Sequence, residues 1–222
     1  MVMAWMERVR RGLPWAAWLL LGGILVAVAA PLEAKVLKVE ASAWQERDGK
    51  LAPLHQGEPL AAGSVLLTNA KGRVQLQLPD GSTLYVGGDS RLQVDELAAP
   101  EGLAEGLVRQ GFTLGKGALR FVTGALAKLK PREVTIRLQT STIGVRGTDF
   151  FAEQDGEEEN VCLFEGKVEV LDSRGPTYQL TEPRQFFHIE KASDAQATIS
   201  TASKKQVANW LRKAMPRGSD DY

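Results

Sequence analysis

Cysteine and histidine are scarce in this chain of 222 residues, which holds one cysteine and two histidines. Because the single Cys162 cannot form an internal disulfide, a hydrophobic core must stabilise the fold. We expect the Cys162 thiol to be buried in an apolar strand, with an intermolecular disulfide or a nucleophile as the alternatives. The histidines, His55 and His188, lie far apart in the sequence, so we expect turn or surface roles for them and no shared metal.

An excess of charge of one sign is also lacking, because 27 basic residues balance 27 acidic ones. No segment combines clustered lysine and arginine with aromatic residues, as nucleic-acid-binding proteins do. The sequence patterns of serine hydrolases, P-loop proteins, zinc proteases and dithiol oxidoreductases are missing as well. We therefore expect no nucleic-acid partner, no enzymatic activity and no cofactor, although a carboxylate pair among Asp80, Asp89 and Glu165 stays open.

The first 34 residues have the features of a targeting segment. Three arginines precede an apolar run at residues 15–30, and Pro31 ends that run. This order predicts a signal peptide cleaved between Ala34 and Lys35, with a cut after Ala29 as an alternative. Residues 12–32 hold 21 uncharged residues in succession, enough to span a bilayer, so an uncleaved membrane anchor is also possible.

In either case the part that begins at Lys35 is translocated, because the arginines stay inside. We expect a periplasmic or secreted protein after cleavage, or a protein anchored in the inner membrane and facing the periplasm. Contact with the membrane is expected only if the segment stays uncleaved.

Beyond residue 35 the chain alternates short apolar stretches with turn residues. Apolar residues alternate with glutamines at 74–78, and Asp80, Gly81 and Ser82 then predict a hairpin turn. Asp48 and Gly49 predict another. Ten or more short strands against one helix indicate an all-β fold, an antiparallel β-sandwich or alternatively a β-solenoid or roll. The β domain is predicted to span residues 35–192, with edge strands that allow pairing between copies.

Residues 139–151 hold the most specific local pattern. Val145 and Phe150 would lie on opposite faces of a regular strand, and a β-bulge at Gly147 would place both on the same face. The bulge would also re-aim Arg146 as the strand bends. We expect Arg146 to pair with a carboxylate or with backbone carbonyls, with ligand binding as the alternative.

Two segments of the β domain are polar or irregular. Glycines weaken a helical pattern at residues 100–110, so we expect a loop or one short turn there. An acidic cluster follows the bulged strand, and its spacing does not match an EF-hand, so we expect a solvated loop rather than a calcium site. The cluster consists of Asp155, Glu157, Glu158 and Glu159.

The C-terminal residues 193–222 read as a linker, a helix and a frayed tail, which makes residues 186–189 the last predicted strand. Ser203 and Gln206 resemble a capping box, and apolar residues at helical spacing predict an amphipathic helix that ends near Met215. We expect this helix to dock on the β domain. Its basic face leaves binding to a partner or a membrane surface as the alternative.

The order of these motifs resembles the FecR-domain family, over roughly residues 36–189. In that family a strand ending in V-R-G-T-x-F precedes a strand ending in E-G-x-V-x-V, and a D-G-S hairpin lies upstream. The matching residues include Asp80, Gly81, Ser82, Arg146, Gly147, Thr148, Asp149, Phe150, Glu165 and Gly166. The resemblance implies a jelly-roll-like sandwich in which these residues are structural or contact a partner.

The resemblance also implies a role in signalling. Members of the family regulate an extracytoplasmic sigma factor through a cytoplasmic domain that precedes the membrane span. About 14 residues precede the apolar run here, too few to fold around a sigma factor. We therefore expect an exported, non-catalytic binding or scaffolding module for a protein or an envelope glycan. The alternative is a component of transmembrane signalling that acts on a sigma factor through a partner protein.

Overall fold

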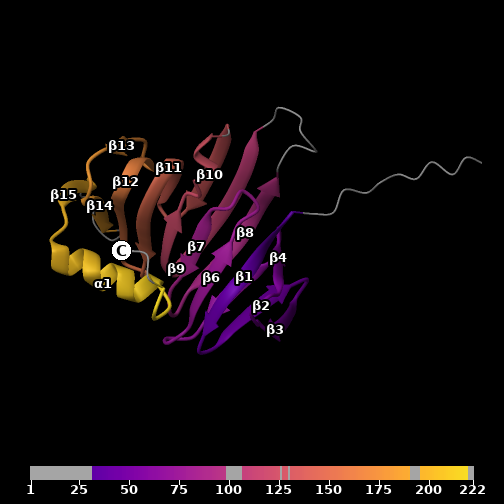
Figure 1. Cartoon of the computed structure of the whole chain (residues 1–222). Coiled ribbons are helices and arrows are strands. Elements are labelled where there is room, and N and C mark those ends of the chain that lie inside the picture. Colours follow the sequence, from indigo (N-terminus) through magenta and orange to yellow (C-terminus); the bar gives the residue numbers. More distant parts are fainter. Residues whose placement is uncertain (1–31, 99–106, 126, 130, 191–195, 220–222) are drawn as a thin grey trace, which may run out of the picture.

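The computed structural model describes residues 32–98, 107–125, 127–129, 131–190 and 196–219. These residues form fifteen strands that all belong to one open sheet, together with a short 3-10 turn, η1 (Ala127–Leu129), and one α-helix (Figure 1). The all-β prediction is confirmed. No helix within the described ranges is long and apolar enough to cross a membrane.

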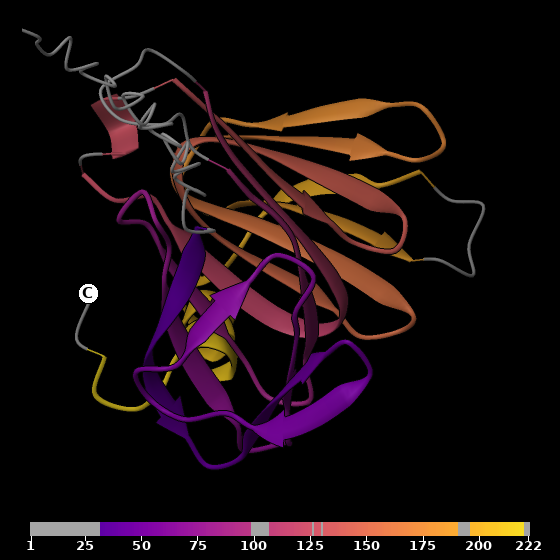
Figure 2. The same cartoon turned by 90° about the vertical axis from the view of Figure 1, so that its right-hand side faces the viewer.

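The sheet folds over into two layers, which we call layer A and layer B (Figure 2). Layer A contains, in spatial order, β4 (Pro59–Ala61), β1 (Glu33–Glu40), β6 (Arg73–Gln77), β7 (Thr83–Val86), the second half of β9 (Val108–Val122), the second half of β11 (Ser141–Gln154), the first half of β12 (Glu158–Asp172), β14 (Gln185–Glu190) and β15 (Thr198–Thr201). Layer B contains β3 (Lys50–Pro53), β2 (Ala43–Arg47), β5 (Val65–Thr68), β8 (Arg91–Ala98), the first half of β9, β10 (Arg132–Arg137), the first half of β11, the second half of β12 and β13 (Thr177–Leu180). Pairings between described strands are antiparallel except for β9 with β10, so the fold is a sandwich and not a parallel solenoid.

Three long strands, β9, β11 and β12, pass from one layer to the other and change partners midway. The predicted bulge at Gly147 is the crossing point of β11, since Arg146 pairs with Lys167 whereas Asp149 pairs with Glu165. Gly147 has a φ of +66°, a conformation that favours glycine. Strands of 14 and 15 residues were not expected, because the bends interrupt the alternation that marks a strand in sequence.

The main core lies between the two layers. Every strand that crosses contributes to it, with Phe112 and Phe121 from β9, Phe150 from β11 and Leu163 from β12 fully buried. Burying each such side chain stabilises the fold by roughly 1.5–3 kcal/mol relative to leaving it exposed. The core thus holds the crossing strands in place from both sides.

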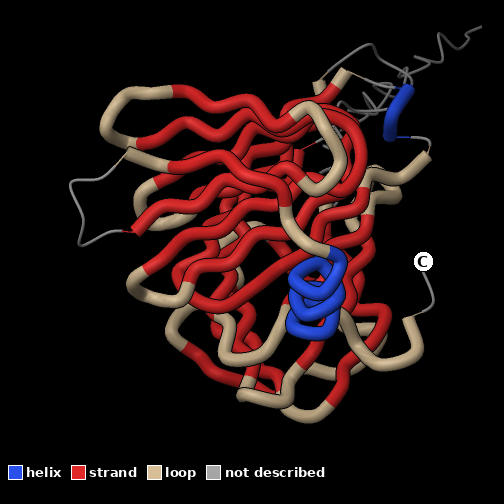
Figure 3. Tube along the Cα trace, turned by 90° about the vertical axis from the view of Figure 1, so that its left-hand side faces the viewer, coloured by secondary structure: helices blue, strands red, loops and turns tan. Residues whose placement is uncertain are grey.

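Helix α1 (Lys204–Ala214) covers the outer face of layer A (Figure 3). The predicted capping box between Ser203 and Gln206 is present at its start, and Met215 caps its end. Trp210 stacks on Phe151 with ring centroids 5.4 Å apart, and the helix packs over Cys162. The expected docking onto the β domain is confirmed, which leaves the outer face of layer B without a helix among the described elements.

Two predictions of segment type were wrong. Residues 193–202 are not linker throughout, because Thr198–Thr201 form β15, which pairs with β14 through the backbone and has no buried side chain. Without apolar alternation nothing in the sequence marked this strand. The loop expected at 100–110 lies mostly outside the described residues, but Val108 already opens β9.

Candidate functional site

Three residues that match the family pattern, Asp80, Ser82 and Thr148, come together where the β6–β7 hairpin approaches the crossing point of β11. Asp80 accepts hydrogen bonds from the backbone N–H of Ser82 (2.9 Å) and from its hydroxyl (3.0 Å), which closes the predicted hairpin. Arg132 Nη1 pairs with Asp80 Oδ2 at 3.1 Å, and both side chains are only 6% exposed. Arg132 Nη2 also donates to Thr123 Oγ1 (2.8 Å), which in turn accepts from the N–H of Thr148 (3.0 Å). We call these five residues the motif junction.

Two glycines allow the backbones at this junction to approach closely. A side chain at Gly124 would lie 2.5 Å from the carbonyl oxygen of Gly81, and one at Gly166 would lie 2.5 Å from that of Gly147. Gly166 also has a φ of +88°. The glycine of the E-G pair is therefore needed because it faces the bulge directly.

Asp149 pairs with Arg120 rather than with Arg146. Arg120 Nε donates to Asp149 Oδ1 at 2.9 Å and Nη2 donates to Oδ2 at 2.7 Å. The Arg120 guanidinium also lies 5.8 Å from the rings of Tyr85 and Phe164, which places a cation against two aromatic faces. The sequence did hold a signal for this residue, because Arg120 interrupts the apolar run 118–122.

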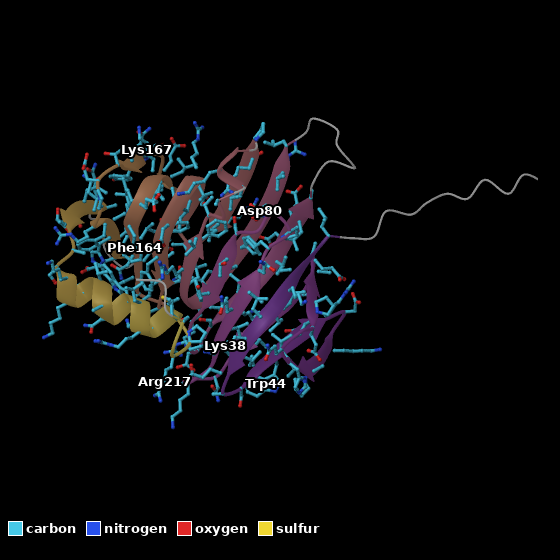
Figure 4. All side chains as sticks on the ribbon, viewed as in Figure 1. Lys38, Trp44, Asp80, Phe164, Lys167 and Arg217 are labelled. Atoms are coloured by element: carbon cyan, nitrogen blue, oxygen red, sulfur yellow. The ribbon has the colours of Figure 1, made fainter. Side chains whose placement is uncertain are left out.

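Arg146 is exposed, and within the described part of the chain no hydrogen bond or ion pair holds it. The predicted pairing at the kink was therefore wrong for this residue. The bulge explains the outcome, since it turns Asp149 to the outer face of layer A and leaves Arg146 on the outer face of layer B, opposite Lys167. Figure 4 shows Lys167 on the side of the molecule that lies away from α1.

The outer face of layer B is polar and mostly charged around these two cations. Arg109 of β9 pairs with Glu133 of the neighbouring β10 (3.7 Å), and Arg137 of β10 pairs across β9 with Asp95 of β8 (3.2 Å). A hollow of about 600 Å³ lies among these four side chains, where Gly111 and Thr135 leave room. We call the surface formed by Asp95, Arg109, Glu133, Arg137, Arg146 and Lys167 the layer B face.

The carboxylates considered for catalysis do not act together. Asp80 belongs to the motif junction, whereas Glu165 is exposed and pairs with Lys128 of η1 at 2.8 Å. Asp89 is exposed in the turn between β7 and β8, at a φ of +50°. The three carboxylates therefore lie in three different local environments.

The acidic cluster is not a solvated loop throughout. Glu159 is fully buried in β12, where its carboxylate accepts hydrogen bonds from the N–H of Thr140 and the hydroxyl of Ser141, both at 2.6 Å. Asp155 is exposed and accepts from the N–H of Glu158. Glu159 was misassigned because its partners come from the β10–β11 turn, which the sequence places elsewhere.

Cys162 and the predicted cleavage site can also be located. Cys162 is fully buried beneath α1, and burial raises the pKa of its thiol to about 12, as expected of a small hydrophobic residue. Ala34 is buried in β1 opposite Leu60, and Lys35 is the next residue of that strand. Cleavage between them would remove the first two residues of β1.

Metal-ligand side chains gather at one place within the described ranges. Glu158, His188 and Glu190 can offer ligand atoms that lie within 4.8 Å of one another. His55, in contrast, lies in a loop and pairs with Glu58 at 3.2 Å. The two histidines thus belong to separate side-chain groups.

Comparisons with known proteins point to one family. Residues 64–169 match the family model described as FecR protein. Two crystal structures of a "putative anti-sigma factor" from Parabacteroides distasonis, at 1.65 and 2.50 Å resolution, each match with a TM-score of 0.50 and 17% sequence identity. The matches cover 66% of this chain and 64% and 63% of those chains, less than two thirds of their length. No curated protein sequence matches.

Proposed function

We propose that this chain, whose residues 64–169 match the FecR family model, acts in transmembrane signalling as a non-catalytic binding module outside the cytoplasm. Its binding surface is the layer B face, centred on Arg146. The single observation that carries this proposal is the exposure of Arg146, which contrasts with the neighbouring Asp149 carboxylate, held by Arg120, and the Thr148 backbone N–H, which donates to Thr123.

Within the motif, some residues stabilise the fold, whereas Arg146 is presented to the solvent. Thr148 and Asp149 hold the crossing point of β11 through Thr123 and Arg120. Arg146 makes no such contact, yet the bulge positions it beside Lys167 on an open sheet face. Two adjacent cations without a partner in the described chain favour a partner that presents carboxylates.

The rest of the layer B face suits a protein partner. The Arg109–Glu133 pair is exposed on both sides and the Arg137 side chain is exposed too, so these arginines gain only about 0–1 kcal/mol from pairing and can exchange partners at low cost. Charged residues at the edge of an interface increase the rate and specificity of association. An envelope glycan is the other occupant that polar side chains around a hollow would accept.

Charge reversal on this face tests the binding role. The variant Arg146→Glu/Lys167→Glu is expected to melt within about 1 °C of the parent, because neither side chain holds the fold. It is expected to lose cross-linking to its envelope partner in the native host and to lose the signal-dependent transcriptional response. Lys205→Glu is the matched control, since this exposed lysine lies on α1 on the opposite side of the sandwich.

Two outcomes would contradict the proposal. If the double variant restores the transcriptional response of a deletion strain as well as the parent does, the layer B face does not carry the signal. If deletion itself changes no sigma-dependent transcription, the signalling role fails and a scaffolding module remains. Intact mass and cell fractionation then test export, since a cytoplasmic chain of full length would contradict it.

A further inference from the structure

The geometry points to a divalent zinc-class metal site formed by His188, Glu158 and Glu190, and we propose that it clamps β14 onto β12. This inference is independent of the layer B face, which lies on the other side of the sandwich. The three residues come from two neighbouring strands that Figure 1 shows beside each other.

The strand register places the three side chains together. Glu158 pairs directly with Glu190, and Asn160 pairs directly with His188. Because side chains two residues apart share a face, these four residues lie on the outer face of layer A, next to the part that α1 covers. A hollow of about 450 Å³ opens there, lined by Glu158 and His188 and, from the helix, by Gln206.

The histidine is held in the form that binds a metal. His188 Nδ1 lies 2.9 Å from Asn160 Oδ1. Since an amide oxygen accepts hydrogen bonds and cannot donate them, the ring proton belongs on Nδ1. In the neutral ring Nε2 then carries the lone pair, and it lies 3.9 Å from Glu190 Oε1. A polar partner on the second ring nitrogen is the usual setting of a metal-bound histidine.

The local excess of negative charge also favours the binding of a cation. Two glutamates directly opposite each other on antiparallel strands repel and destabilise the pairing. Asp155 adds a third carboxylate to the hollow. The one lysine that lines it, Lys213, pairs with Glu153 at 2.5 Å and so leaves this group without a counter-ion of its own.

The ligand types select the class of metal. One imidazole nitrogen with two carboxylates suits Zn²⁺ and similar transition metals, whereas Ca²⁺ and Mg²⁺ prefer oxygen ligands alone. Zinc ligands lie about 2.0–2.2 Å from the ion. The Glu190 side chain is 62% exposed and free to turn toward His188, which closes the remaining distance. Water completes the coordination shell.

Zinc titration of the full chain, made without a histidine tag, tests the site. Calorimetry is expected to show one Zn²⁺ per chain with micromolar affinity, and the melting temperature is expected to rise by several degrees in zinc relative to chelator. His188→Ala should weaken binding at least tenfold, and Asn160→Ala should weaken it by about tenfold through loss of the ring orientation. His55→Ala, the matched control, should bind as the parent does.

A second variant keeps the test independent of folding defects. Glu190→Gln changes an exposed side chain and removes the repulsion with Glu158, so it should melt at or above the parent in chelator and lose most of the response to zinc. Equal zinc binding by the parent and by His188→Ala would overturn the proposal. So would a stabilisation by Ca²⁺ as large as that by Zn²⁺, since it would mean a plain acidic cluster.

Discussion

Arg120 and Asp149 form a bidentate ion pair beneath the end of α1, with N–O distances of 2.9 and 2.7 Å. Their side chains are 3% and 15% exposed. Arg120 Nη1 also lies 2.9 Å from Met215 Sδ, the residue that caps the helix. The pair therefore ties the middle of the sheet to both the bulged strand and the docked helix.

Removal of the carboxylate should destabilise the protein strongly. Asp149→Ala removes the carboxylate that pairs with the buried Arg120 guanidinium, and breaking such a pair costs about 3–5 kcal/mol in free energy of unfolding. At ~2–4 °C per kcal/mol for a chain of this size, the melting temperature should fall by about 10 °C. Arg146→Ala is the control and should stay within ~0.5 kcal/mol of the parent, as surface substitutions do. Equal losses in both variants would mean that Arg146 is also a structural residue.

The outcome for these two arginines shows which parts of the site the sequence can predict. The bulge was predicted because a change of parity around Gly147 is visible in a few adjacent residues. The partner of Asp149 lies 29 residues away, and that of Asp80 lies 52 residues away. No local pattern relates such pairs, because the partners lie on different strands and turns that only the folded sheet brings together.

The same distinction applies to the fold. Both Asp-Gly hairpins and the capped helix have short sequence signatures, and both kinds of element were predicted with their turns or caps. β15 has no buried side chain. Glu159 is a charged residue type that is usually exposed, yet it is fully buried in β12. Neither could be predicted, since one depends on backbone pairing alone and the other on a distant turn.

Gly166 should be the least replaceable glycine of the motif. Gly166→Ala places a Cβ 2.5 Å from the backbone oxygen of Gly147 and forces an alanine to a φ of +88°. The strained backbone costs about 1–3 kcal/mol before the clash is counted. Gly144→Ala on the same layer should be nearly neutral, because its Cβ would meet nothing closer than 3.9 Å. Urea unfolding of both variants measures the difference, and similar midpoints would contradict the close approach.

The Cys162 thiol should be inert in the folded protein. Burial raises its pKa from the ordinary 9.0 to about 12, and the thiolate is the reactive form. A thiol reagent at pH 8 should therefore modify the protein in denaturant but not in buffer. Because the folded-state pKa is the higher one, the stability that depends on the neutral thiol is complete below about pH 9 and is lost as pH rises toward 12. Rapid modification in buffer would place the thiol at the surface.

The start of the folded chain should matter for stability. A chain that begins at Leu32 keeps the pairing of Ala34 with Leu60, whereas one that begins at Lys35 loses it together with the buried Ala34 methyl group. We expect the shorter chain to unfold at a lower temperature by several degrees, since burial of one methyl is worth about 0.8 kcal/mol and a backbone hydrogen bond about 1 kcal/mol. Calorimetry of both chains decides this. Equal melting temperatures would show that the first residues of β1 contribute nothing, and a cut at Lys35 would then be harmless.

An apolar residue in place of Gln110 should increase the stability of the protein. Its side chain is 3% exposed, and both amide atoms are buried without a hydrogen-bond partner among the described residues. Such a group loses its contacts with water and gains nothing in return, which costs about 1–3 kcal/mol. Gln110→Met, similar in shape, should therefore raise the free energy of unfolding by about that amount.

Gln154 provides the matched comparison for this substitution. It is fully buried too, but its Oε1 accepts a hydrogen bond from the N–H of Gln139 at 3.0 Å. Gln154→Met removes that buried hydrogen bond and should lower stability by about 1–3 kcal/mol. Chemical denaturation of the two variants should thus move in opposite directions. A loss of stability in both would mean that Gln110 is hydrogen-bonded in solution, and the substitution would then have removed a contact rather than relieved a cost.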